Sequence, residues 1–206
     1  MLRSGGSSKS DKQQYTLQSV RTLYTSGNGV RVTAVAQWKQ WLFVGRKDGR
    51  LSMVRMDNGQ EMFSCQPHSM AISKIVHFSD HIVSSGHDRQ IVGHQINNNG
   101  KLVESFRLQA HQSPIHSILP LDSSRLVSCD SEGRSMLWEA NQSGTMQVVQ
   151  SVDTKQVGPN TLYQMAKNDD GSHIAVSIGE EVWIVKSDDR KVVVKIQVKV
   201  PVSSVL

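Results

Sequence analysis

Eight histidines give the chain side chains that could ligate a metal ion. They are His68, His77, His81, His87, His94, His111, His116 and His173. A zinc site needs three or four converging ligands. The closely spaced pairs His77/His81 and His87/His94 fall where strand-like segments meet turns, so their members do not share a helical face. We therefore predict structural histidines and no bound metal.

Neighbouring carboxylates are the second group that could do chemistry, because two carboxylates facing across a cleft can hydrolyse a glycosidic bond. The pairs are Asp169-Asp170, Glu180-Glu181 and Asp188-Asp189. All lie in turn-like segments, where carboxylates accept backbone N–H bonds, so a glycosidase pair is the less favoured alternative. No G-x-S-x-G nucleophile motif occurs, and Gly6–Ser10 lacks the first glycine and the strand of a phosphate-binding loop. We predict no catalytic residue, no cofactor and no enzymatic activity.

One group of aromatic and basic residues has the composition of an interface anchor, which combines exposed tryptophan with arginine. The group is Trp38, Trp41, Arg46, Lys47 and Arg50. We predict that it contacts a partner protein. The alternative is that Trp41 packs in the core.

The formal net charge of +5 and the pI of about 9.3 leave nucleic-acid binding open as a second function. A basic rim could be formed by Arg46, Lys47, Arg50, Lys195 and Lys199. Lysines alternating with apolar residues near the C-terminal end are equally typical of an outer strand kept from pairing with other chains. We favour this structural interpretation.

The sequence also gives an expectation about the cellular compartment. Cys65 and Cys129 occur without a CxxC or CxxH pattern, which favours buried, reduced thiols over a zinc site. The first residues lack the apolar segment of a secretory signal, and no apolar run is long enough to span a bilayer. We expect a cytoplasmic or nuclear protein.

These residues must be positioned by a fold, and a repeat in the chain predicts which fold. The pattern apolar-x-x-apolar-apolar recurs five times at intervals of 40 to 47 residues. The copies begin at Val32, Ile72, Ile115, Leu162 and Val202. The first four are each followed by three further strand-like segments separated by turns rich in Gly, Asn and Asp. We predict an all-β chain with four antiparallel strands per unit.

Units of this length and strand number resemble the blades of a WD-repeat β-propeller. The third unit, "AHQSPIHSILPLDSSRLVSCDSEGRSMLWEA", carries the resemblance best. It implies a structural, non-catalytic hydrogen-bond network of His111, Ser128, Glu132 and Trp138. The other units depart from the pattern, with Val54, His94 and Val185 at the tryptophan position. By resemblance we expect a scaffold that binds other proteins through the rims of its blades.

The predicted organisation is a disordered polar arm over residues 1–14 and a propeller over 15–206. The blades are expected at residues 30–70, 71–110, 111–157 and 158–200, with 201–206 starting a fifth. Four blades and a fifth opening strand suggest part of a larger propeller. A closed four-blade ring, or an open half completed by another chain, remains as an alternative.

Overall fold

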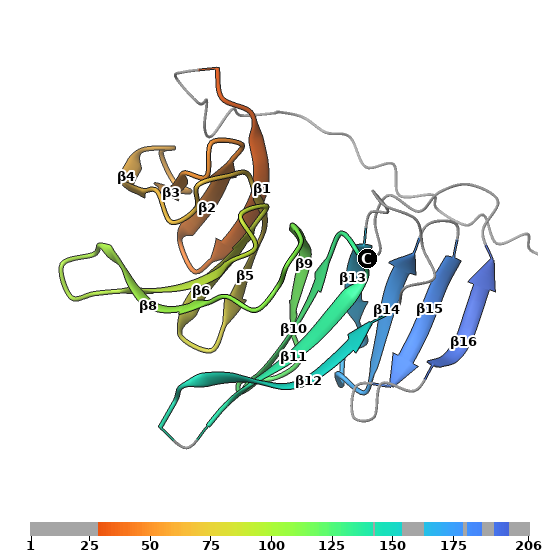
Figure 1. Ribbon diagram of the computed structural model, residues 1–206. Helices are drawn as coiled ribbons and strands as arrows, with labels where there is room; N and C mark the ends of the chain where they lie inside the picture. The colour runs from red at the N-terminus through yellow and green to blue at the C-terminus, as the bar shows by residue number, and fades with distance from the viewer. Residues whose placement is uncertain (1–28, 142, 154–162, 179–180, 187–191, 198–206) are drawn as a thin grey trace, which may run out of the picture.

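The computed structural model describes residues 29–141, 143–153, 163–178, 181–186 and 192–197. Sixteen strands form four antiparallel sheets of four, each in sequential order (Figure 1). The first two sheets are β1 (Val32–Trp38), β2 (Trp41–Arg46), β3 (Leu51–Arg55), β4 (Glu61–Cys65), β5 (Ile72–Phe78), β6 (His81–Gly86), β7 (Ile91–Ile96) and β8 (Leu102–Leu108). The other two are β9 (Ile115–Pro120), β10 (Arg125–Asp130), β11 (Arg134–Ala140), β12 (Met146–Asp153), β13 (Tyr163–Lys167), β14 (His173–Ile178), β15 (Glu181–Lys186) and β16 (Val192–Gln197).

The expectation of an all-β chain built from four-stranded units is confirmed. The described residues contain no helix, and so none that is long and apolar enough to cross a membrane. The opening strands β1, β5, β9 and β13 lie side by side, and the last strand of each sheet lies on the outside of an open arc (Figure 1). The expected N-terminal arm and the opening strand of a fifth unit lie outside the described residues, and the domain boundaries stay a prediction.

An irregularity at the same place in every sheet confirms the repeat alignment. The pairing of the third and fourth strands shifts register once in each sheet. The shift comes immediately before Val54, His94, Trp138 and Val185, which are the residues that the repeat aligns with tryptophan. A bulge bends the strand and increases its twist, so each sheet acquires the same shape.

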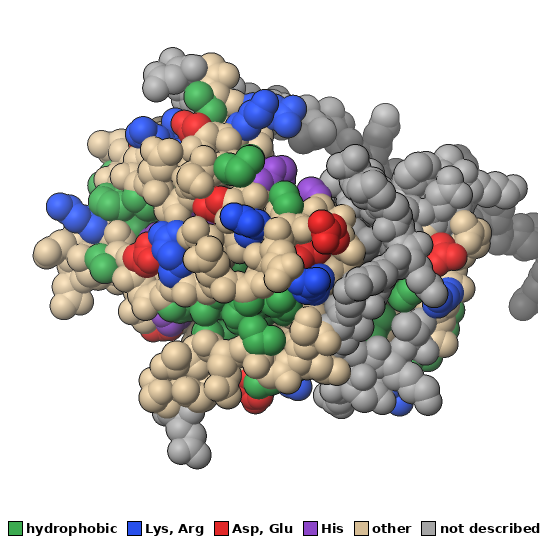
Figure 2. Space-filling model, in the orientation of Figure 1, with side chains coloured by type: hydrophobic (Ala, Val, Ile, Leu, Met, Phe, Trp, Pro, Cys, Tyr) green, Lys and Arg blue, Asp and Glu red, His purple; other side chains and the backbone are tan. Residues whose placement is uncertain are grey.

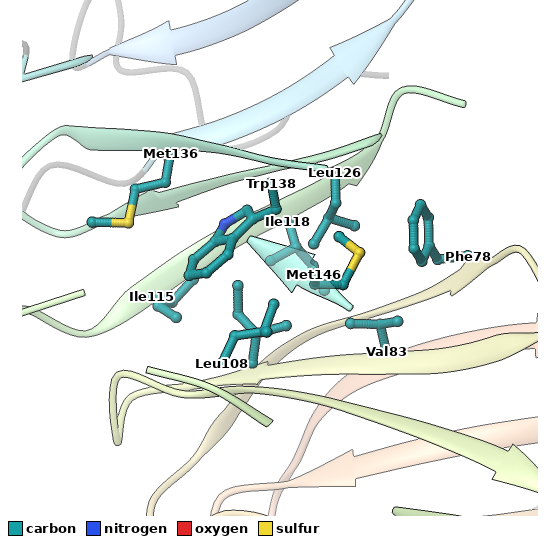
Figure 3. Close-up of a cluster of buried hydrophobic side chains, with 10 residues drawn as sticks. Phe78, Val83, Leu108, Ile115, Ile118, Leu126, Met136, Trp138 and Met146 are labelled. Atoms are coloured by element: carbon teal, nitrogen blue, oxygen red, sulfur yellow. The ribbon is translucent and has the colours of Figure 1, made fainter. Parts of the chain in front are cut away.

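The hydrophobic core is divided into three clusters, each between two neighbouring sheets. Phe43 and Ile72 lie in the first, Trp138 in the second, and Trp183 in the third. Figure 3 shows the middle cluster, in which Phe78 and Val83 of the second sheet face residues of the third sheet. Each sheet is therefore stabilised mainly by its neighbours, as in other repeat proteins.

The turn between β2 and β3 requires glycine, which gives a first testable prediction. Gly49 has φ of +85°, and a Cβ at this position would collide with the backbone carbonyl of His68. We expect Gly49→Ala to lower the free energy of unfolding by about 1–3 kcal/mol. Gly100→Ala is the matched control, because Gly100 has φ of +72° with open space around it. Equal losses in chemical denaturation would show that the packing against His68 does not matter.

Candidate functional site

A buried hydrogen-bond network links the loop before β9 to the middle of the third sheet. His111 Nδ1 lies 2.8 Å from Asp130 Oδ2, and His111 Nε2 lies 2.6 Å from Ser128 Oγ. The indole Nε1–H of Trp138 donates to the same Ser128 Oγ at 2.8 Å. All four side chains are buried. The network therefore fixes the loop against strands β10 and β11.

The connectivity of this network matches that of a Ser-His-Asp catalytic triad, so its accessibility decides what it can do. Because Ser128 Oγ accepts from Trp138, its own hydrogen is free to donate to His111 Nε2, and His111 Nδ1–H then donates to Asp130. Ser128 is 0% exposed. A nucleophile must reach its substrate, and this hydroxyl reaches only His111 and Trp138. The arrangement is suited to stabilising the fold.

The acidic member of the network is Asp130, whereas the WD-repeat resemblance implies Glu132. The Glu132 side chain is exposed, and its backbone N–H donates to Asp130 Oδ1 at 3.1 Å. Asp130 stands two residues nearer to Ser128 along the chain, at the end of β10, and this places its carboxylate directly against the histidine. The signal that could have found it is an aspartate just after the Ser-Cys of the strand.

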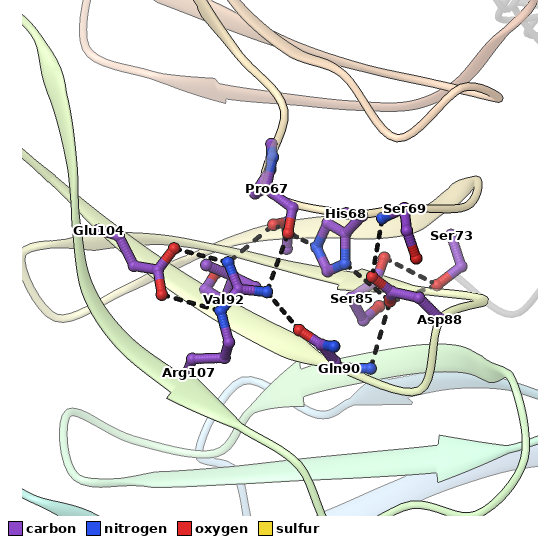
Figure 4. A network of polar contacts seen from close by, with 11 residues as sticks. Pro67, His68, Ser69, Ser73, Ser85, Asp88, Gln90, Val92, Glu104 and Arg107 are labelled. Atoms are coloured by element: carbon purple, nitrogen blue, oxygen red, sulfur yellow. Dashed lines mark hydrogen bonds and ion pairs between the residues drawn. The ribbon is translucent and has the colours of Figure 1, made fainter.

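The second sheet holds a related network that uses a different position for its carboxylate (Figure 4). His68 Nδ1 lies 2.9 Å from Asp88 Oδ1, and His68 Nε2 lies 2.9 Å from Ser84 Oγ. Asp88 aligns with Glu132, and Gly86 aligns with Asp130. A Cβ at Gly86 would lie 2.6 Å from both Asp88 Oδ1 and His68 Nδ1. Asp88 and Asp130 thus both place a carboxylate beside the histidine of their own sheet, although they occupy different positions of the sequence repeat.

His94 occupies the tryptophan position of this second network without completing it. Its side chain is 3% exposed, and its Nδ1 atom is buried with no hydrogen-bond partner. Burial lowers the pKa of His94 to about 4, against a smaller opposing effect of Glu104. The charged form is therefore disfavoured inside the folded sheet.

Arg107 connects the outer strand of the second sheet to the same region (Figure 4). Its guanidinium donates to both carboxylate oxygens of Glu104, at 2.9 and 2.6 Å, and to the carbonyl of Pro67 at 3.0 Å. It also donates to Gln90 of the β6–β7 turn. The hydrogen bond from Arg107 lowers the pKa of Glu104. These contacts hold the turn and the preceding loop in one position.

The placement of the carboxylate can be tested by two neutral substitutions. We expect Asp130→Asn to lower the free energy of unfolding by about 1.5–3 kcal/mol, because hydrogen bonds to a buried charged group are lost. Glu132→Gln, at an exposed side chain, should stay within about 0.5 kcal/mol of the wild type. Chemical denaturation measures both, and a larger effect at Glu132 would contradict the assignment.

The aromatic residues suggested as partner contacts lie at the β1–β2 turn. The ring of Trp38 stacks on His77, with 4.8 Å between centroids, and Lys39 Nζ lies 4.4 Å from the centroid of Trp38. Both Trp38 and Trp41 are half-buried and pack against the cluster between the first two sheets. The two tryptophans therefore serve packing, with part of each ring at the surface.

The basic members of that group lie at the opposite end of the same sheet, at the end of β2 (Arg46) and in the β2–β3 turn (Lys47 and Arg50). A six-residue strand separates the two ends by about 20 Å, so the structure does not bring the tryptophans and the basic residues together. Arg46 is buried and pairs with Glu61 at 3.1 Å. Lys47 and Arg50 are exposed. Partner binding by this group stays a prediction, and its exposed basic residues are Lys47 and Arg50.

The proposed basic rim is also divided. Lys195 lies on β16 of the fourth sheet, with Nζ 3.8 Å from the centroid of the Trp183 ring, far from the first sheet (Figure 1). Lys199 lies outside the described residues. Figure 2 shows Lys and Arg side chains interspersed with Asp and Glu on the face in view. Among the described residues, that face carries no continuous basic stripe.

Metal-ligand and redox chemistry find little support in the part of the chain that the structure describes. No group of three or more His, Cys, Asp or Glu side chains there converges as metal ligands would. Cys65 is half-buried, Cys129 is buried, and neither forms a disulfide. Burial raises the pKa of the Cys65 thiol to about 11, so little reactive thiolate forms at neutral pH.

The fold of these sheets is that of a WD-repeat β-propeller, and solved structures with this fold superpose well. A chain of the "Crystal Structure of Mitotic Checkpoint Complex" is 16% identical, with a TM-score of 0.75, over 90% of this chain and 57% of that one. The Myceliophteria thermophila Cps50 (Swd1) β-propeller domain is 12% identical, with a TM-score of 0.68, over 84% and 57%.

The WD40 β-propeller domain of Doa1 is 16% identical, with a TM-score of 0.65, over 82% of this chain and 54% of that one. This chain therefore spans less than two thirds of each of the three. No protein-family model and no curated protein sequence matches the chain significantly. At these identities the superpositions show the fold, and its function has to be argued from the surface.

Proposed function

We propose that the chain is a non-catalytic scaffold that binds other proteins at the ends of its sheets. The observation that supports this proposal is that the buried polar side chains are hydrogen-bonded to one another inside the fold. His68, His111, Ser84 and Ser128 are all buried and bonded to one another or to Asp side chains, which leaves the loops and turns as the surface available for recognition.

The fixed ends of the sheets are the best candidates for the binding surface. His68 and His111 each anchor the loop before a new sheet, and the turns after β2, β6 and β10 are tied to the opening strands by backbone bonds. These run from Lys47 N to Arg31 O, from His87 N to Ala71 O and from Ser131 N to Pro114 O, at 2.8–2.9 Å. Surfaces held rigid before binding lose less conformational entropy on association.

Three structures with this fold give the proposal a parallel in other proteins. The structure with the TM-score of 0.75 is that of the mitotic checkpoint complex, which is an assembly. That analogy supports a protein partner for this chain without naming it. On the same analogy we propose that the chain belongs to an intracellular complex.

A nucleic-acid-binding module is the second candidate, supported by the net charge of +5. The two functions differ in salt dependence, because binding to nucleic acid falls steeply with the logarithm of the salt concentration. The division of the basic residues between the first and fourth sheets favours the protein partner.

Affinity capture from cell extract at low and high salt, with and without nuclease, tests the proposal. The wild-type chain should retain the same proteins in high salt after nuclease treatment, and Lys47→Glu combined with Arg50→Glu should release them. Lys101→Glu, at an exposed outer hairpin, is the matched control. Retention that disappears with nuclease, or turnover of a sugar or phosphoester substrate lost with one carboxylate, would contradict the scaffold.

A further inference from the structure

A concave site opens where the inner strands of the sheets meet the β2–β3 and β6–β7 turns. It encloses about 380 Å³. We call it the basic mouth and define it by Arg31, Thr33, Lys47, Ser73, His87 and His116. Gln164 of β13 completes its wall, so all four sheets contribute to it. Figure 2 shows histidine side chains near Lys and Arg side chains on the face in view.

The charged side chains that line the basic mouth, Arg31 and Lys47, are both cationic. No carboxylate lines it, and neither Arg31 nor Lys47 forms an ion pair within the described residues. Two acidic residues lie nearby: Asp48 Oδ1 accepts from Arg50 N at 3.2 Å, and Asp130 is paired with His111 but also acts on His116. Two uncompensated cations in a concavity create a positive potential that attracts a compact anion.

The two histidines add hydrogen-bonding groups to this charge. The rings of His87 and His116 meet edge to face, with 5.4 Å between centroids. Burial lowers the pKa of His116, as does His87, and Asp130 opposes both. At neutral pH His116 is therefore mostly neutral, and an anion beside it would favour the protonated, two-donor form.

The hydrogen-bond donors that line the mouth come from all four sheets. Arg31 and Lys47 offer charge-assisted bonds, while the histidine rings and the Gln164 amide approach from other sheets. A phosphomonoester carries close to two negative charges and three strong acceptor oxygens. Its charge and oxygen count match this donor set.

Apolar residues in the mouth indicate what carries the anion. Val32, which is 39% exposed, and the half-buried Ala71 form part of its wall. A side chain next to the phosphate could pack against these residues. The mixed charge of the surrounding face (Figure 2) suits a polypeptide better than an extended polyanion.

We propose that the basic mouth binds a phosphomonoester group carried by a partner polypeptide. Only the polypeptide carrier rests on the scaffold function proposed above. The anion site itself can be tested with inorganic phosphate, so failure of one proposal is distinguishable from failure of the other.

The test is a nuclear magnetic resonance titration of the chain, labelled at its histidine rings, with inorganic phosphate and with a degenerate phosphoserine peptide library. We expect saturable shifts of the His87 and His116 ring signals, assigned with His87→Gln and His116→Gln, and a measurable rise of the His116 pKa. The phosphorylated library should bind at least about tenfold more tightly than the same library with serine.

Arg31→Gln and Lys47→Gln should each weaken phosphate and phosphopeptide binding by about 3- to 10-fold, because both side chains are exposed and removable without disturbing the core. Lys101→Gln is the control and should change neither affinity. Equal weakening by all three would show non-specific charge attraction and overturn the site.

Each remaining outcome also decides the proposal. Absence of any shift with phosphate overturns the anion site while leaving the scaffold function standing. Phosphate binding without preference for the phosphorylated library overturns the polypeptide carrier. An RNA or DNA oligonucleotide that displaces the phosphopeptide, and that loses affinity in Lys47→Gln, would assign the mouth to nucleic acid.

Discussion

Replacing Trp138 by alanine should lower the free energy of unfolding by about 3–5 kcal/mol, the usual range for a buried tryptophan. Trp138 is 3% exposed and lies in the cluster between the second and third sheets (Figure 3), where it also donates to Ser128. Its loss opens a cavity between two sheets and removes one bond of the buried network. Chemical denaturation followed by circular dichroism measures the effect.

Two controls separate packing from hydrogen bonding at this position. Trp138→Phe keeps most of the apolar contact and removes the bond to Ser128, so about 1 kcal/mol of its loss should come from that bond. Trp41→Ala, at a half-buried ring, should lose less than Trp138→Ala. A loss below 1 kcal/mol for Trp138→Ala would show that the register of the third sheet is wrong.

Acid should destabilise the protein through His94, by about 3 kcal/mol in all. The folded-state pKa of His94 is about 4, and its ordinary value is 6.5. A histidine with a lowered pKa binds fewer protons when folded than when unfolded. Its contribution is therefore fully present above pH 6.5 and is lost as the pH falls from 6.5 to 4, at about 1.4 kcal/mol per unit.

His94→Leu provides the test, because it keeps an apolar side chain in the buried site and removes the titrating group. The slope of unfolding free energy against pH between 4 and 6.5 should fall by about 1.4 kcal/mol per pH unit in this variant. An unchanged slope in His94→Leu would contradict the burial of a neutral His94.

Much of the fold could be predicted because strand, turn and repeat signals are local. The recurring pattern that begins at Ile72 and Ile115 marks the inner strands β5 and β9. The alignment of Val54 and His94 with Trp138 is confirmed by the register shift that precedes each of them. The strands and the tryptophan position recur in the same order in every unit, so they can be recognised from the sequence.

The candidate site could be predicted only in part, because it depends on side-chain reach. Asp130 and Glu132 both stand in the β10–β11 turn, and only the fold shows which carboxylate reaches His111. Trp41 and Arg46 are five positions apart in sequence, yet β2 carries them to opposite ends of the first sheet. Trp41 and Arg46 have the composition expected of one contact site, but the extended strand β2 holds them apart.

The basic mouth could not be predicted from spacing, since its residues come from four different sheets. His87 and His116 lie in separate repeats, and their contact depends on how the second and third sheets pack. Lys47 comes near them only because equivalent turns and inner strands of the sheets lie side by side in the fold. Such sites require the three-dimensional arrangement.

Hydrogen–deuterium exchange of the chain, free and bound to a captured partner protein, tests the central claim most directly. The account predicts slower exchange in the turns around Lys47, His87 and Ser131, which lie at equivalent ends of the first three sheets, with little change in the outer strands β4, β8 and β12. Protection confined to the outer strands, or protection produced only by nucleic acid, would contradict a protein-binding scaffold that uses these turns.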